Sequence, residues 1–228
     1  MGKAFASQSP LPFALAVCIF FAGGCSRTHA GDAEAVSVEK DVKIPMRDGV
    51  NLLASIYKPK KMPRPLPVLF LLTPYGADFQ VRRGHWYAQR GYVIATIDVR
   101  GCGHSEGTFK PFENEGRDGH DVVEWLALQP WCNGKVGMFG WSYLGWCQWS
   151  TIKECPPHLE TIVPGVSTYP GTAGIPKNRN IFLPYVMSWL NDVARCSGRP
   201  SPGLDDYLYW QERLANREAS GLSIDAFC

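Results

Sequence analysis

Ser142 is the residue of this sequence best placed to act as a nucleophile. It lies in the segment Lys135–Gly145, where apolar, strand-forming residues come first and the start of an apolar helix follows. Gly140 precedes the serine at a position where a side chain would obstruct a sharp turn. A serine at such a turn stands proud of a sheet, and the backbone N–H groups of the new helix point at any anion formed beside it. The segment therefore predicts a nucleophile elbow.

The segment departs from the usual elbow pattern, Gly-x-Ser-x-Gly. Its second glycine is Gly145, one position later than expected, and Leu144 occupies the expected place. The alternative is a plain strand-to-helix connection, because turns that contain glycine and serine are common. The sequence that flanks the segment favours the nucleophile.

Apolar segments alternate with helical ones on both sides of the elbow, and this alternation predicts an α/β fold with a largely parallel sheet. Asp48-Gly49 predicts a hairpin between the first two strands. After Val166 the composition changes to glycine, proline and threonine, and two helical stretches near 182–193 and 204–214 suggest the start of an inserted cap. The predicted strands are 36–44, 52–57, 67–73, 92–99, 136–139 and 159–166, and the predicted helices are 79–90, 118–129 and the one after Ser142.

Composition argues against several classes of function. The chain has 228 residues, 45% of them hydrophobic, and a net charge of +2, so nothing indicates a nucleic-acid partner. It has eight cysteines but no Cys-x-x-Cys pair, which gives poor support to a zinc or thioredoxin-type site. The sequence does not define disulfide pairing, and Cys147 and Cys155 could equally be small buried hydrophobic residues.

The N-terminal residues 1–30 are typical of a signal peptide. Lys3 precedes an apolar run over 11–22 that is too short to span a bilayer as a mature helix. The stretch that ends at Cys25 resembles the lipobox of bacterial lipoproteins, although Ala22 stands where that pattern prefers leucine. Cleavage near Ala30 or Ala35 is the alternative. We therefore expect an exported protein, either periplasmic, extracellular or attached to a membrane through a lipidated Cys25.

The segment Ile44–Val166 resembles the α/β-hydrolases of the Xaa-Pro dipeptidyl-peptidase group, which also holds cocaine-esterase-like (CocE/NonD) hydrolases, α-amino-acid ester hydrolases and glutaryl acylases. The elbow of this group is Gly-x-Ser-Tyr-x-Gly, which agrees with the late position of Gly145. Cys102 and His104 depart from the polar or basic residues expected in the glycine-rich loop. The matching residues are Met46-Arg47-Asp48-Gly49-Val50, Pro74-Tyr75-Gly76, Gly91-Tyr92, Asp98-Val99-Arg100-Gly101, Ser105-Glu106-Gly107, Asp118-Gly119 with Asp121, Glu124-Trp125, Gln129-Pro130-Trp131, Gly134-Lys135-Val136-Gly137 and Gly140-Trp141-Ser142-Tyr143-Leu144-Gly145.

The resemblance implies the first six strands of an α/β-hydrolase over residues 36–170 and the start of a helical cap over 171–228. It implies that Ser142 is the nucleophile and that the backbone N–H of Tyr143 and the phenolic O–H of Tyr75 are the two oxyanion donors. A strand-end tyrosine that hydrogen-bonds water is the alternative reading of Tyr75. The implied substrates are small esters, amides or peptides, and no cofactor or metal is implied.

The base and the acid of a catalytic triad are missing from the expected places. In this fold the chain order is serine, acid, histidine, yet His158 is the only histidine after Ser142 and precedes Asp192 and every later aspartate. His158 also lies in a helix-to-strand connection that we place at the far end of the sheet. We therefore expect the N-terminal part of a larger hydrolase, inactive alone, whose triad is completed by later strands or by a separate C-terminal half. The alternative is a truncated or degenerate exported protein that binds a ligand or partner without catalysis.

Overall fold

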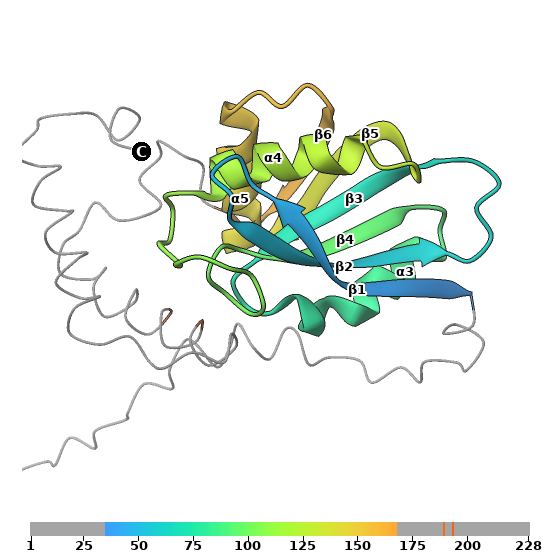
Figure 1. Cartoon of the computed structure of the whole chain (residues 1–228), viewed down its shortest axis with the longest axis horizontal. Coiled ribbons are helices and arrows are strands. Elements are labelled where there is room, and N and C mark those ends of the chain that lie inside the picture. The colour runs from blue at the N-terminus through green and yellow to red at the C-terminus, as the bar shows by residue number, and fades with distance from the viewer. Residues whose placement is uncertain (1–34, 168–188, 190–192, 194–228) are drawn as a thin grey trace, which may run out of the picture.

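The computed structural model describes residues 35–167 together with Trp189 and Val193. Its centre is one mixed sheet with the strand order β1-β2-β4-β3-β5-β6 (Figure 1). The strands β1 and β2 are antiparallel to their neighbours, and β4, β3, β5 and β6 run parallel to one another. The strands are β1 (Val36–Pro45), β2 (Asn51–Pro59), β3 (Leu66–Thr73), β4 (Val93–Asp98), β5 (Cys132–Trp141) and β6 (Leu159–Gly165), and the helices are the 3-10 helix η1 (Ala77–Gln80), α3 (Val81–Ala88), α4 (Glu115–Ala127) and α5 (Tyr143–Lys153).

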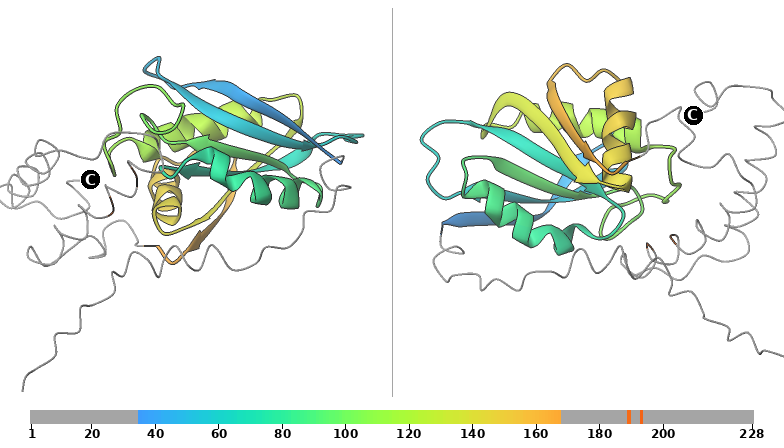
Figure 2. Two further views of the ribbon diagram at one scale, coloured as in Figure 1. Left: turned by 90° about the horizontal axis from the view of Figure 1, so that it is seen from below. Right: turned by 180° about the vertical axis from the view of Figure 1, so that it is seen from behind.

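The sheet is buried on both faces at its centre. Side chains alternate along a strand, and every residue of β4 is buried. Val93 and its alternate neighbours pack into the main core with Val122 and Leu126 of α4, whereas Ile94 packs with Ala88 of α3. The helices α3 and α4 therefore cover opposite faces, which Figure 2 shows with strands of the sheet between them.

The helices α4 and α5 approach each other closely through two glycines of α4. A Cβ atom at Gly119 would lie 1.9 Å from Thr151 Oγ1, and one at Gly116 would lie 2.9 Å from the Ser150 carbonyl oxygen. Because no side chain separates them at these points, the first turn of α4 lies against α5, the helix that begins beside Ser142.

The predicted order of strands and helices is confirmed, with small differences at two helices. The helix predicted over 79–90 is divided into η1 and α3, and Phe79 is exposed. The helix predicted from Asp118 begins at Glu115, which is buried in the first helical turn. From the sequence alone, polar residues at that point are indistinguishable from the preceding loop.

Two further expectations are partly wrong. Cys147 and Cys155 are free thiols, as is Cys132, and Cys147 is buried whereas Cys155 is exposed. The reading as a small buried hydrophobic residue therefore holds for Cys147 and is wrong for Cys155. A sheet that stops at its sixth strand should leave the backbone groups of Ile162 and Val163 unpaired at its edge. In the part of the chain that the structure describes, β6 is the edge strand, but the Val163 N–H donates to the side chain of Gln148.

The predicted signal segment with Cys25, and most of the predicted cap, lie outside the described residues. Trp189 and Val193 of the cap region are described, and both are helical. Among the helices that the structure describes, none has the length and apolarity needed to cross a membrane.

Candidate active site

Ser142 is an exposed residue at the start of α5, and its backbone makes the sharp turn predicted from the sequence. Its φ of 58° and ψ of −123° lie outside the regions that L-residues readily adopt. Its N–H donates to the Gly165 carbonyl oxygen at 2.9 Å, and its carbonyl oxygen accepts from the N–H groups of Gly145 and Trp146 at 2.9 and 3.0 Å. Surroundings that hold one non-glycine residue in a strained conformation are typical of functional sites. The role of Ser142 as a nucleophile stays a prediction.

Both glycines of the elbow are required by close packing. A Cβ atom at Gly140 would lie 2.5 Å from Leu144 Cβ, on the other side of the turn. A Cβ atom at Gly145 would lie 2.5 Å from Ser167 Cβ and 3.2 Å from the Gly165 carbonyl oxygen. The second glycine therefore falls one position late because the first turn of α5 crosses the end of β6 at Gly145.

Tyr75 lies at the same end of the sheet as Ser142, where the parallel strands have their carboxyl ends. The strands β3 and β5 are parallel neighbours, with Phe70 paired with Met138. Counting onward along both strands places Pro74 level with Ser142, so Tyr75 follows β3 beside the elbow. The Tyr75 hydroxyl oxygen accepts a hydrogen bond of 2.8 Å from Trp189 Nε1. The structure thus brings two of the three predicted site residues to one edge, and the third, Tyr143, is adjacent to Ser142 in the chain.

The side chain of Tyr143 is buried, and its hydroxyl donates to Oε1 of Glu115 and accepts from the N–H of Phe112 at 3.2 Å. Burial raises the pKa of Glu115 to about 7, with the Tyr143 hydrogen bond acting in the opposite direction. Among the described residues Glu115 Oε2 has no hydrogen-bond partner. The contact anchors the first residue of α5, whose backbone N–H is the predicted oxyanion donor. Glu115 was not predicted from the sequence, because it precedes the helix predicted from Asp118 and reads there as a polar loop residue.

Asp98, at the end of β4, fixes the loop that carries Tyr75. Its Oδ1 accepts from the N–H of Ala77 at 2.7 Å, and its Oδ2 accepts from the N–H of His104 at 3.4 Å. Burial raises the pKa of Asp98 to about 6, against the effect of these two N–H donors. A Cβ atom at Gly103 would lie 2.1 Å from Asp98 Oδ2, so the glycine-rich loop closes tightly over the carboxylate. Asp98 therefore ties the Tyr75 loop to the glycine-rich loop.

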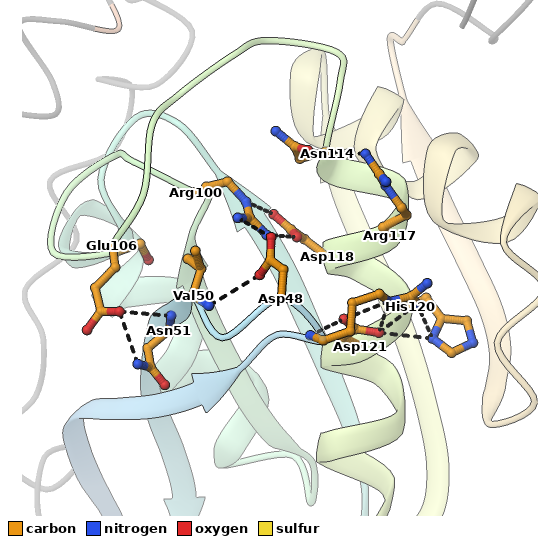
Figure 3. A network of polar contacts seen from close by, with 12 residues as sticks. Asp48, Val50, Asn51, Arg100, Glu106, Asn114, Arg117, Asp118, His120 and Asp121 are labelled. Atoms are coloured by element: carbon orange, nitrogen blue, oxygen red, sulfur yellow. Dashed lines mark hydrogen bonds and ion pairs between the residues drawn. The ribbon is translucent and has the colours of Figure 1, made fainter.

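An ion-pair network joins three elements: the turn between β1 and β2, helix α4, and the glycine-rich loop that follows β4 (Figure 3). Arg100 donates to both carboxylate oxygens of Asp118, from Nε at 3.0 Å and from Nη2 at 2.6 Å, and from Nη1 to Asp48 at 2.7 Å. Arg47, in the turn between β1 and β2, pairs with Asp121 of α4 at 2.7 Å. Bidentate arginine–carboxylate pairs have defined geometry, so the network fixes α4, and with it Glu115, relative to the sheet.

His158 lies at the opposite end of the sheet from Ser142, as predicted. Its carbonyl oxygen accepts from the N–H of Val136 in β5, and its Nδ1 contacts Glu124 Oε2 at 2.8 Å. The six residue steps along the strand from Val136 to Ser142 span roughly 20 Å. The histidine is therefore too distant to take a proton from the serine in this arrangement.

The residues Cys102 and His104 do not form a metal site together. Cys102 is buried, and His104 contacts Asp41 at 3.1 Å through Nδ1. Within residues 35–167 and at the two described positions beyond, no cluster of three or more histidine, cysteine or acidic side chains could hold a metal ion.

Comparison with known proteins identifies relatives over most of the described chain. The X-Pro dipeptidyl-peptidase (S15) family matches residues 48–223. The cocaine esterase of Rhodococcus sp. (strain MB1 Bresler) is 36% identical over 138 residues, which cover 58% of this chain and 24% of that protein. The chain thus spans about a quarter of the length of the curated relatives that it matches.

Solved structures agree with this family assignment. An α-amino acid ester hydrolase is 30% identical with a TM-score of 0.56, covering 65% of this chain and 28% of that one. A CocE/NonD family hydrolase from Staphylococcus aureus is 26% identical with a TM-score of 0.60, covering 72% of this chain and 34% of that one. The sheet is accordingly part of an α/β-hydrolase domain. The chain belongs to the X-Pro dipeptidyl-peptidase (S15) family, a family of hydrolases.

Proposed function

We propose that this chain is the nucleophile-bearing part of a serine hydrolase that acts on small esters or amides, including peptides. The observation that carries the proposal is the conformation of Ser142, an exposed residue held at positive φ between a parallel strand and a helix. That geometry presents a hydroxyl at the edge of the sheet where a substrate carbonyl could approach it.

The proposed reaction proceeds through an acyl-enzyme. Ser142 Oγ attacks the carbonyl carbon, a histidine takes the hydroxyl proton, and the carbonyl oxygen becomes an anion. The backbone N–H of Tyr143 and the O–H of Tyr75 stabilise that anion. The histidine then gives its proton to the departing alcohol or amine, and water hydrolyses the ester formed on Ser142 in the second half of the reaction.

We propose that the histidine and its acid come from outside residues 1–228. His158 lies at the far end of the sheet, and no other histidine follows Ser142 in the sequence. We propose that later strands of a longer protein, or a separate C-terminal half, supply both groups. The short span of the chain relative to its relatives supports this division. We further propose that the protein acts after export, in free form or attached to a membrane through Cys25.

Ester hydrolysis by the complete enzyme tests the proposal. With an activated ester such as p-nitrophenyl acetate, Ser142→Ala should lower kcat by about a millionfold, as loss of a triad nucleophile does. Ser150→Ala is the matched control, because Ser150 lies on the same helix away from the elbow. Retention of parental turnover in Ser142→Ala would refute the assignment, and absence of Ser142-dependent turnover in the parent would favour a protein that binds without catalysis. Residues 1–228 alone should show no efficient turnover.

A further inference from the structure

Gln148 is a buried polar side chain whose amide connects three elements at the elbow. It lies on α5 and is 0% exposed. Its Nε2 donates to the carbonyl oxygens of Gly140 at 3.2 Å and Leu144 at 3.1 Å, and its Oε1 accepts from the N–H of Val163 at 2.8 Å. The amide therefore has a partner for both donor hydrogens and for its oxygen, each partner being a backbone group.

These contacts bracket Ser142. Gly140 lies two residues before the serine at the end of β5, and Leu144 lies two residues after it in the first turn of α5. The third partner, Val163, belongs to β6 and anchors the amide to the edge of the sheet. One side chain thus joins the strand that enters the turn, the helix that leaves it and the neighbouring strand.

The hydrogen bonds of Gln148 hold the backbone on both sides of a strained turn. Ser142 has a φ of 58°, and a non-glycine residue keeps such a conformation only where its surroundings determine it. The side chain of Gln148 supplies a donor to the Gly140 carbonyl oxygen, on the strand that enters this turn.

We propose that Gln148 is a positioning residue that holds the hydroxyl of Ser142 in its reactive place, an inference that rests on the proposed function. Gln148 acts through the backbone on both sides of the serine and does not touch the reacting atoms. Its loss should relax the turn by a fraction of an ångström, which weakens the alignment of nucleophile and carbonyl more than it weakens substrate binding.

Turnover of the complete enzyme provides the first test. Gln148→Met keeps the length of the side chain and removes all three hydrogen bonds, and should lower kcat about 10- to 100-fold with KM little changed. Thr151→Val is the matched control. Thr151 is equally buried on α5, and its hydroxyl donates to the Cys147 carbonyl oxygen at 2.8 Å, within the helix. The control should keep its kcat even where its thermal stability falls as far as that of Gln148→Met.

Amide hydrogen exchange provides a test that does not depend on activity. In Gln148→Met the Val163, Gly145 and Trp146 amides should exchange faster, whereas the amides of the β1–β2 hairpin should be unchanged. If Gln148→Met does not fold, Gln148→Glu keeps the size and the acceptor for Val163 but retains at most one of the two donor hydrogens, and should also lower kcat.

Several outcomes would overturn the inference. An unchanged kcat in a folded Gln148 variant would do so, and so would an equal loss of kcat in Thr151→Val. Unchanged exchange at Val163 and around the elbow would show that the amide does not hold the turn. If the parent enzyme has no Ser142-dependent turnover, the proposed function fails, and the exchange measurement still decides whether Gln148 holds the turn.

Discussion

The indole Nε1–H of Trp189 donates a hydrogen bond of 2.8 Å to the phenol oxygen of Tyr75, a residue 114 positions earlier in the chain. The ring of Trp189 also stacks on Tyr143, with ring centroids 5.1 Å apart and planes 27° apart. One side chain from beyond the sheet therefore contacts both residues that the sequence predicts as oxyanion donors. An indole N–H can only donate, so this contact uses a lone pair of the Tyr75 oxygen and not its proton.

Removal of the Tyr75 hydroxyl should impair catalysis and spare the fold. We expect Tyr75→Phe in the complete enzyme to lower kcat about 100- to 1000-fold, because one of two oxyanion donors is lost. Steady-state kinetics with an activated ester measure the effect. Tyr92→Phe is the control, since Tyr92 precedes β4 at the amino-terminal ends of the parallel strands, the end of the sheet opposite to Ser142. An unchanged kcat in Tyr75→Phe would show that Tyr75 has only a structural role.

The elbow glycines should tolerate no side chain. Gly145→Ala would bring a methyl group to 2.5 Å from Ser167 Cβ, and Gly140→Ala to 2.5 Å from Leu144 Cβ. We expect each to lower the free energy of unfolding by about 2–4 kcal/mol through overpacking. Gly140→Ala adds backbone strain, because Gly140 has a φ of +149°. Denaturant unfolding measures the loss. Gly134→Ala is the control for backbone strain alone, because Gly134 has a φ of +82° but no atom within 4 Å of the place its methyl group would take. Equal losses in all three variants would contradict the packing argument.

Glu115 should make the protein less stable as the pH rises. Its pKa is raised by burial from 4.5 to about 7 in the folded state, so the folded protein binds a proton more tightly than the unfolded chain does. This contribution to stability is fully present below pH 4.5 and is lost as the pH rises through 7. The shift corresponds to about 3 kcal/mol.

Thermal unfolding of Glu115→Gln from pH 4 to pH 8 checks this expectation. The variant cannot titrate at this position, so its melting temperature should fall less with rising pH than that of the parent. Asp98, with its pKa raised to about 6, contributes a trend of the same sign, and Asp98→Asn separates the two contributions. Parallel profiles for the parent and Glu115→Gln would show that Glu115 is not protonated in the folded state.

The N-terminal segment should be removed on export. Mass spectrometry of the mature protein from a bacterial host should show an acylated N-terminus at Cys25 or cleavage near Ala30 or Ala35. Cys25→Ser separates these alternatives, because it abolishes acylation and leaves ordinary cleavage unaffected. An intact Met1 in the exported fraction would contradict the expected processing.

The sequence predicts the sheet well because hydrophobic patterns report burial directly. The apolar run of β3 predicts a strand buried on both faces, and the glycine–serine turn after β5 predicts a change from strand to helix. The position of Tyr75 beside Ser142 also follows, since the carboxyl ends of adjacent parallel strands meet at one edge of the sheet.

The polar contacts beneath the site were not predictable in the same way. Glu115 meets Tyr143 across 28 positions, and Gln148 meets Val163 across 15. Such pairs depend on the distance between two helices or between a helix and an edge strand, which no local pattern encodes. The late glycine, Gly145, did carry a signal, because a glycine inside an apolar helix is unfavourable unless packing or function requires it.

Covalent labelling tests the central claim, that Ser142 is the nucleophile, most directly. The complete enzyme is treated with a fluorophosphonate, which forms a stable adduct with activated serines, and is then digested with trypsin. The peptide Val136–Lys153 contains two serines, Ser142 and Ser150, and fragment ions distinguish them. We predict a single adduct on Ser142 and full protection by a competing ester substrate. An adduct on Ser150, or hydrolysis that persists while Ser142 stays unlabelled, would contradict the assignment.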